Sequence, residues 1–132
     1  MALKLEIITP DRVVQSCEAA YVSLPGVEGE FGVLPGHVPL VAALKVGCMH
    51  YTRDGKNIHA SIGGGFAEIA DDRVAVLVDS AELASEVNVS RAEAALKRAR
   101  DRLTAGRGDD VNVIRAEAAL QRAISRLQAT KL

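Results

Sequence analysis

Two segments near the C-terminal end of the chain are close copies of each other, and this repeat constrains the fold more than any other feature. Residues 91–103 and residues 115–127 match at ten of thirteen positions, and Gly106 and Gly108 lie between them. Both copies are rich in Ala, Leu, Arg and Glu, which favour helices, and Gly is the usual residue after a helix end. The repeat therefore predicts an antiparallel hairpin of two similar helices.

The predicted helices carry matching apolar stripes, because apolar residues recur in both copies at spacings of three and four. Ala lets two backbones approach closely, whereas each Leu contributes roughly 2 kcal/mol when fully buried. The contact between the helices is therefore specific in shape but modest in energy, and the hairpin needs a support that it is able to exchange for another. The stripes consist of Val89, Ala92, Leu96, Ala99 and Leu103, and of Val113, Ala116, Leu120, Ala123 and Leu127.

The ends of the helices carry capping signals. Ser90 followed by Glu93 fits a capping box at the start of the first helix. Asp109 and Asp110 favour the positive end of the second helix. The hairpin is therefore expected to occupy residues 87–132.

Residues 1–86 show short alternating or β-rich runs separated by turn residues, which is typical of a sandwich or a flattened barrel. Asp54-Gly55 is a strong signal for a two-residue hairpin between two of these runs. The predicted fold class is α+β, with a mainly β N-terminal domain of residues 1–86 followed by the two-helix hairpin. The expected strands are residues 3–7, 21–24, 49–53, 56–61, 66–69 and 73–78.

The net charge of −1 hides an uneven distribution along the chain. Residues 1–89 carry 6 Lys and Arg against 12 Asp and Glu, whereas residues 90–132 carry 10 against 5. The basic helices have two uses, because they can dock on the acidic body or on an acidic surface elsewhere. No nucleic-acid partner is expected, since the acidic body repels nucleic acid and no nucleic-acid-binding module is visible.

The chain shows no long apolar run and no secretory signal pattern, so we expect no direct membrane insertion and a cytosolic default. Cys17 and Cys48 are far apart in sequence and are expected to be free thiols. His37, His50 and His59 lack the spacing of a metal site, although a hairpin at Asp54-Gly55 would place the last two on facing strands. No metal site is predicted.

No catalytic pattern emerges from the sequence. The Gly-rich residues 26–37 lack the Gly-Lys-Ser/Thr of a phosphate loop, and residues 63–65 precede a strand rather than a helix. No Ser/His/Asp or Cys/His arrangement is present, so elimination indicates a binding or mechanical protein rather than an enzyme. Arginines recur beside both helical stripes. Either they are helix formers whose aliphatic side-chain carbons cover apolar surface, or they form a site for a phosphate group.

Three segments together resemble the epsilon subunits of bacterial F-type ATP synthases, which are proton-translocating enzymes. They are residues 28–40, residues 64–68 and the Arg-Ala repeats of the two helices. The resemblance implies a non-catalytic rotor subunit of the central stalk that couples the gamma subunit to the ring of c subunits. It implies a peripheral location on the cytoplasmic face of the bacterial inner membrane. By likeness, Glu28 and Glu30 match the turn that faces the c-ring, and His37 matches a position near gamma.

The resemblance also implies a regulatory role. In the family the hairpin folds against the sandwich or extends along gamma toward the catalytic beta subunit, and the extended form inhibits ATP hydrolysis. Alternatives from other classes are a stand-alone nucleotide-sensing regulatory adaptor, and a small enzyme that uses the Gly-rich turn. Co-purification with gamma separates the first from the leading interpretation, and turnover by the chain alone would favour the second.

No cofactor is required by this interpretation, but ATP is a candidate regulatory ligand. Some family members bind ATP through an Ile/Leu-Asp-x-x-Arg-Ala motif, and residues 87–92 match it at Arg91 and Ala92. Asn88 stands where the motif has Asp, and the lost charge predicts weak or absent ATP binding. The remaining candidate contacts implied by the resemblance are Glu82, Arg98, Arg122 and Arg126.

Overall fold

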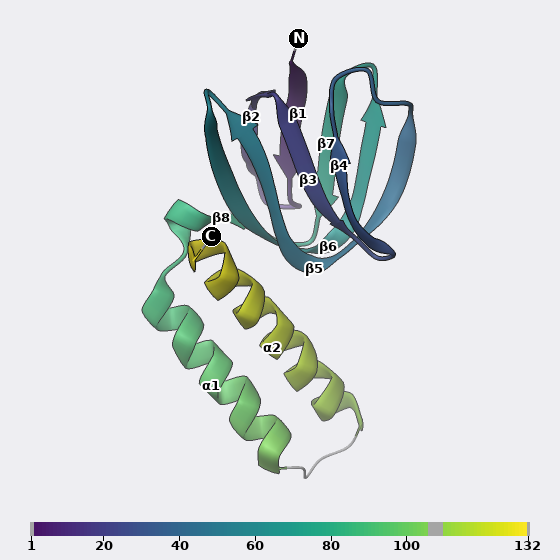
Figure 1. Cartoon of the computed structure of the whole chain (residues 1–132). Coiled ribbons are helices and arrows are strands. Elements are labelled where there is room, and N and C mark those ends of the chain that lie inside the picture. Colours follow the sequence, from purple (N-terminus) through teal and green to yellow (C-terminus); the bar gives the residue numbers. More distant parts are fainter. Residues whose placement is uncertain (1, 106–109, 132) are drawn as a thin grey trace.

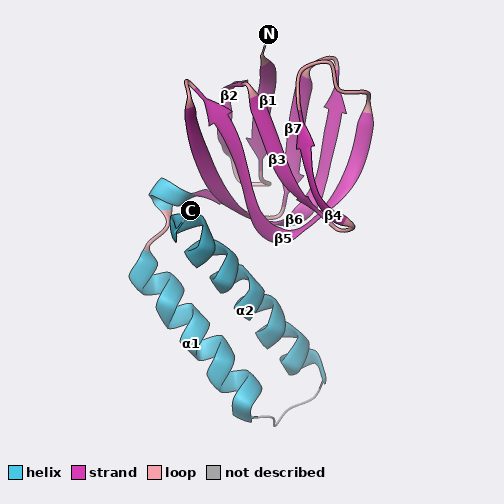
Figure 2. Cartoon of the chain, in the orientation of Figure 1, coloured by secondary structure: helices cyan, strands magenta, loops and turns pink. Residues whose placement is uncertain are grey.

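The computed structural model describes residues 2–105 and 110–131 and shows a β-sandwich followed by two contacting helices (Figures 1 and 2). The predicted fold class is therefore confirmed. A short 3-10 helix, η1 (Ala84–Glu86), leads from the sandwich to helix α1 (Val89–Ala105), and helix α2 (Asp110–Lys131) follows. The strands are β1 (Leu3–Ile8), β2 (Val13–Ala19), β3 (Tyr21–Gly26), β4 (Gly29–Val33), β5 (Leu40–Arg53), β6 (Lys56–Ala70), β7 (Arg73–Val78) and β8 (Ala81–Leu83).

The strands form one continuous sheet that folds over on itself. Their order is β2-β1-β7-β6-β5-β3-β4, with β8 added beside β6, and the only parallel pair in the described residues is β1 with β7. The long strands β5 and β6 belong to both layers. Their pairing passes from Leu44↔Gly65 to Val46↔Gly63 and omits one residue on each strand, which marks the bend.

Glycines make this bend sterically feasible. Gly64 and Gly65 have φ angles of +92° and +152°, which residues with a Cβ atom rarely adopt. A Cβ atom on Gly65 would collide with the Leu77 carbonyl oxygen of β7. The glycine run therefore bends one strand and allows close backbone approach. It corrects the prediction of separate strands at residues 56–61 and 66–69.

The hydrophobic core lies between the two layers and is supplied by the strands. Its largest fully buried side chains include Tyr51, Leu3, Leu5, Ile7 and Met49. Among the described residues, none of the core cluster comes from α1 or α2. The sandwich thus has a core that does not depend on the helices.

Small residues line the contact between the helices. Ala92 and Ala99 of α1 and Ala116 and Ala123 of α2 are almost completely buried, as the stripe predicted. Val89, in contrast, is 43% exposed and lies outside the contact. The helices therefore pack closely through Ala, with less apolar burial than the full stripes would supply.

Ser90 was predicted to cap α1, and this prediction was wrong. The side-chain oxygen of Asn88 accepts a hydrogen bond from the Arg91 backbone N–H at 3.0 Å, so Asn88 is the N-cap and Ser90 lies inside the helix. The predicted Gly106 and Gly108 turn and the Asp109 signal lie outside the described residues.

Candidate functional site: the contact between α2 and the sandwich

Helix α2 packs on the outer face of β5 and β6, and α1 packs against α2. Figure 1 shows that only the C-terminal part of α2 lies against the sandwich, while the other end of the hairpin points away. We call the residues that join the two parts the docking contact. It consists of Cys48 on β5, Ser61 on β6, Glu82 on β8, and Ser125 and Arg126 on α2.

A hydroxyl pair forms the centre of the docking contact. The Ser125 and Ser61 hydroxyl oxygens are 2.8 Å apart, and both residues are buried. The Cys48 thiol donates to the Ser125 carbonyl oxygen at 3.0 Å, and its sulfur lies 3.8 Å from the Ser125 hydroxyl. Burial raises the pKa of Cys48, partly offset by the hydrogen bond with Ser125, so the thiol is protonated at neutral pH.

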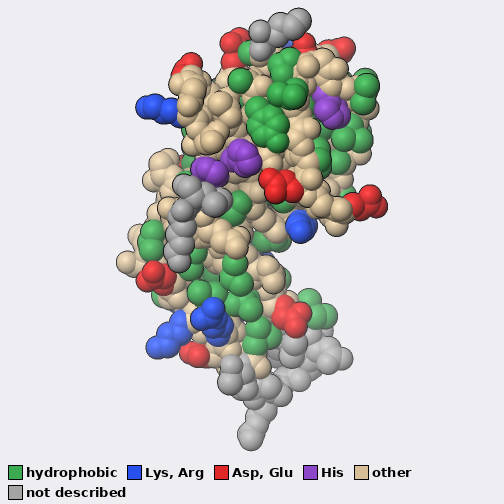
Figure 3. All heavy atoms as spheres, in the orientation of Figure 1, with side chains coloured by type: hydrophobic (Ala, Val, Ile, Leu, Met, Phe, Trp, Pro, Cys, Tyr) green, Lys and Arg blue, Asp and Glu red, His purple; other side chains and the backbone are tan. Residues whose placement is uncertain are grey.

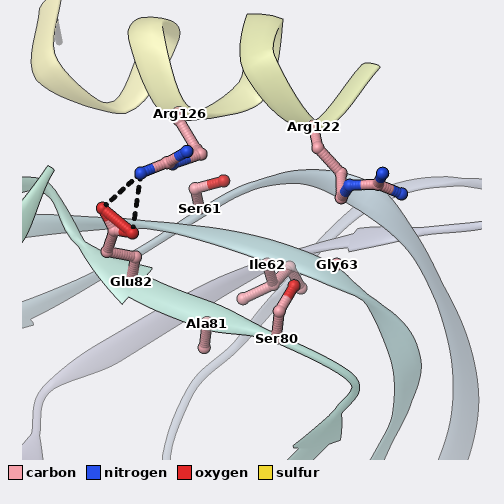
Figure 4. A pocket seen from close by; sticks show the side chains of 8 residues that line it. All are labelled: Ser61, Ile62, Gly63, Ser80, Ala81, Glu82, Arg122 and Arg126. Atoms are coloured by element: carbon pink, nitrogen blue, oxygen red, sulfur yellow. Dashed lines mark hydrogen bonds and ion pairs between the residues drawn. The ribbon is translucent and has the colours of Figure 1, made fainter. Parts of the chain in front are cut away.

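An ion pair flanks these hydroxyls. One terminal nitrogen of Arg126 donates to both carboxylate oxygens of Glu82 at 3.1 Å, and the two side chains are only 29% and 28% exposed. Figure 4 shows the guanidinium of α2 directly above the carboxylate of β8. This ion pair joins the basic helices to the acidic body, which is one of the two arrangements that the charge distribution predicted. Arg126 Nε is buried and has no hydrogen-bond partner among the described residues.

A pocket of about 280 Å³ adjoins this ion pair between α2 and the sandwich. Arg122 points along it from α2, while Gly63 and Ser80 lie below (Figure 4). Its volume is near the lower end of the range for small-molecule sites. The pocket is lined by Ser61, Ile62, Gly63, Ser80, Ala81, Glu82, Arg122 and Arg126.

The structure brings together only part of the candidate ATP-binding set. Glu82, Arg122 and Arg126 share the pocket. Arg91 and Arg98 are exposed on α1 and do not line it. The two remaining candidates have structural roles, because Asn88 caps α1 and Ala92 is fully buried.

The residues that the family resemblance assigns to contacts with the c-ring and gamma lie at opposite ends of strand β4. Glu28 is exposed in the β3–β4 turn, and Glu30 is exposed at the start of β4, where its carboxylate accepts a hydrogen bond from the Ser23 hydroxyl at 2.6 Å. His37 lies beyond the other end of β4, half-buried, with its Nδ1 atom 2.6 Å from the Val38 carbonyl oxygen. Glu28 therefore remains the freer carboxylate of the turn.

Sequence reasoning missed the polar centre of the docking contact, which is formed by Cys48, Ser61 and Ser125. Single Ser and Cys residues carry no periodic pattern. One signal was available, because Ser125 occupies the repeat position that Asp101 holds in the first copy. The exchange permits burial at this position, because an unpaired Asp is almost never fully buried.

Comparison with known proteins places the whole chain in a family. Residues 2–84 match the family model described as ATP synthase, Delta/Epsilon chain, beta-sandwich domain. Residues 85–131 match the ATP synthase, Delta/Epsilon chain, long alpha-helix domain. The chain belongs to the ATP synthase delta/epsilon family. The resemblance seen in the sequence is thereby confirmed, and the chain is a non-catalytic ATP synthase subunit, as expected.

Individual relatives agree with this assignment. The ATP synthase epsilon chain of Lawsonia intracellularis is 51% identical over 108 residues, which cover 82% of this chain and 81% of the relative. The epsilon chain of Nitratidesulfovibrio vulgaris is 49% identical over 102 residues, covering 77% and 76%.

Solved structures share the fold. A chain in the Euglena gracilis mitochondrial ATP synthase structure superposes with a TM-score of 0.83 at 27% identity, covering 99% of this chain and 82% of that one. A chain in the Tetrahymena thermophila mitochondrial ATP synthase structure, described as central stalk/c-ring, gives 0.62 at 11% identity, covering 98% and 97%. Within the described residues, neither helix has the length and apolar character needed to cross a membrane.

Proposed function

We propose that this chain is a central-stalk rotor subunit of a proton-translocating F-type ATP synthase, coupling the gamma subunit to the c-ring. Its helical hairpin restrains ATP hydrolysis when it leaves the sandwich and reaches the catalytic beta subunit. Family membership supports the place in the complex, and the nature of the docking contact supports the regulation. The subunit sits peripherally on the cytoplasmic face of the bacterial inner membrane, within the complex.

The observation that carries the regulatory proposal is that the contact between α2 and the sandwich has a polar centre. Two serine hydroxyls, one thiol and one ion pair connect parts that each bury their own apolar residues. Each neutral hydrogen bond contributes about 1 kcal/mol net, and water replaces all of these partners on release. The contact therefore holds the hairpin without making its release prohibitive.

The exposed charges of the helices support an acidic destination for the released hairpin. Arg91, Arg98, Arg115 and Arg122 are exposed while the hairpin is docked. Such charges accelerate encounter with an acidic surface and select against basic ones. An acidic segment of the catalytic beta subunit fits this chemistry.

The exposed β3–β4 turn supports the coupling role. Glu28 and Glu30 can pair with cationic loops of the c-ring, and such rim charges contribute specificity more than affinity. His37, at the far end of β4, is assigned to the side of the sandwich that faces gamma. The separation of these residues along β4 suits a subunit held between two partners.

For ATP, we propose that any regulatory binding is weak. Two of the four candidate arginines line the pocket, and one of these, Arg126, already forms an ion pair with Glu82. The unpartnered Arg126 Nε offers a donor to a phosphate group, but Asn88 serves as a helix cap and supplies no charge. Titration of ATP into the full chain beside Arg122→Ala tests this. Micromolar binding that the variant loses would overturn the proposal.

A reversible lock tests the regulatory proposal. The hydroxyls of Ser61 and Ser125 already touch, so Ser61→Cys with Ser125→Cys places two thiols where a disulfide can form. The native Cys17 and Cys48 are first replaced by Ser, to prevent alternative bridges. In the assembled complex, oxidation should raise ATP hydrolysis to the rate of a complex lacking residues 90–132, and reduction should lower it again.

The control for the lock is Ser125→Cys alone in the same background, which should not respond to oxidation. Equal hydrolysis rates before and after oxidation of the double variant, with a disulfide verified by mass, would refute regulation by release of the hairpin.

Failure of the chain to purify with gamma would refute the stalk assignment and favour the stand-alone adaptor.

A further inference from the structure

Two histidines that the proposed function does not use lie side by side on the outer face of the sandwich. His50 of β5 and His59 of β6 are direct partners in the sheet, and their ring centres are 5.4 Å apart. Figure 3 shows two adjacent histidine side chains at the surface, close to the junction with the helices. The Asp54-Gly55 signal predicted that the two strands face each other here, and the pairing confirms it.

The register of the hairpin explains why these side chains lie so close. The chain turns at Asp54 and Gly55, whose φ angles of +52° and +75° fit a two-residue turn, and Arg53 pairs with Lys56. In such a hairpin the closing pair is hydrogen-bonded, and the following pairs alternate between non-hydrogen-bonded and hydrogen-bonded. His50 and His59 are three pairs further along and form a non-hydrogen-bonded pair, whose Cα atoms are about 4.5 Å apart.

The spacing of the rings fits a shared metal ion. Two imidazoles on one tetrahedral ion, each with an N–metal bond of about 2.0 Å, have ring centres roughly 5 Å apart. The observed 5.4 Å requires only a small adjustment. The Tyr21 ring, with its centre 5.9 Å from that of His50, packs beside the pair. Both histidines lie on paired strands and not on a loop, so the sheet fixes their separation.

The state of His59 also suits a metal ligand. Its Nδ1 atom is buried without a hydrogen-bond partner among the described residues, which leaves Nε2 as the nitrogen for an ion.

We propose that His50 and His59 form a two-histidine chelating site for a divalent transition-metal ion of the Zn²⁺ and Ni²⁺ class. Imidazole nitrogen suits these ions, whereas Mg²⁺ and Ca²⁺ prefer oxygen ligands. The described residues hold no cluster of three or more His, Cys, Asp or Glu side chains arranged for a metal, so water completes the coordination. While the hairpin is docked, the Cys48 thiol does not join, because it donates a hydrogen bond to the Ser125 carbonyl oxygen.

The test is calorimetric titration of the full chain with Zn²⁺ and, separately, with Ni²⁺ and Mg²⁺. We expect one saturable site for Zn²⁺ and Ni²⁺ and none for Mg²⁺, with loss of saturable binding in His50→Asn and in His59→Asn. His37→Asn is the matched control, since that histidine lies elsewhere on the sandwich, and it should bind as the wild type does. Circular dichroism verifies that the variants fold.

A second readout is the melting temperature, which should rise with Zn²⁺ for the wild type and for His37→Asn only. Three results would each overturn the proposal. They are the absence of saturable Zn²⁺ binding to the wild type, equal binding by folded His59→Asn, and loss of binding in His37→Asn.

Discussion

Removing the charge of Glu82 should loosen the hairpin by a predictable amount. The Glu82→Gln substitution keeps the size of the side chain but turns a charge-assisted pair with Arg126 into a neutral contact. Hydrogen bonds to charged groups contribute about 1.5–3 kcal/mol. The side chains are a little over a quarter exposed, which favours the lower end of this range. A loss of about 1.4 kcal/mol corresponds to a tenfold rise in the released fraction.

The native thiol of Cys48 supplies the assay. The thiol is half-buried and donates a hydrogen bond to the Ser125 carbonyl oxygen of α2. Iodoacetamide should therefore react faster when the helix has lifted, and the labelling rate should rise with the population of the released state. Cys17→Ser removes the second thiol. In that background we expect Glu82→Gln to raise the rate by up to roughly tenfold. The matched control is Glu117→Gln on the exposed face of α2, which should leave the rate unchanged.

A double substitution sharpens the test. In Glu82→Gln, the half-buried guanidinium of Arg126 has lost its counter-charge, and an unpaired charge is costly to keep from water. Adding Arg126→Gln removes that cost, so the double variant should label no faster than Glu82→Gln alone. Unchanged labelling in Glu82→Gln, or rates that simply multiply in the double variant, would refute the view that this pair holds the hairpin.

The remaining predictions concern the bend, the independence of the sandwich and alkaline pH. Gly65→Ala should lower the free energy of unfolding by more than about 2 kcal/mol, since its Cβ atom meets the Leu77 carbonyl; Gly36→Ala, with open space around it, should cost less in urea denaturation. Deletion of residues 90–132 should leave a cooperatively melting sandwich that still binds gamma in a pull-down assay, because the core cluster contains no helix residue. Docking should weaken as pH rises above about 9, since burial raises the docked pKa of Cys48 above its ordinary value of 9.0 and the released thiol ionises first. A reporter of the distance between α2 and the sandwich should show no such weakening for Cys48→Ser.

The sequence predicted those strands whose apolar runs and turns were both clear. The Asp54-Gly55 turn and β7 (Arg73–Val78) are confirmed, because each follows a local rule. Strand β4 (Gly29–Val33) was missed, since its glycines suggested turns, and β2 (Val13–Ala19) was missed because it lacks regular alternation. Strand β6 was divided at its glycines, since only the neighbouring β7 backbone explains why a strand needs them there.

The site was predictable only in part, and mainly through the family resemblance. Glu82, Arg122 and Arg126 were named from that resemblance, and the structure brings them together. The ion pair between Arg126 and Glu82 was not predictable, because the two residues are 44 positions apart in the chain. Arg98 was placed with them in expectation, but it lies exposed on α1. Chemistry can be recognised in a sequence, whereas contacts between distant elements depend on the complete packing.

The differences between the two repeat copies explain why α2, and not α1, docks on the sandwich. The first copy has Arg100 and Asp101 where the second has Ile124 and Ser125. Ser125 is 3% exposed in the docking contact. A helix with the first sequence would bring a carboxylate to that position, where burial of an unpaired charge costs several kcal/mol. Both helices therefore share the Ala stripe that pairs them, while the exchange of Asp101 for Ser125 gives only α2 an uncharged residue at the centre of the docking contact. Because hydroxyl and thiol hydrogen bonds beside one ion pair form this centre, the exchange that permits docking also leaves the contact reversible.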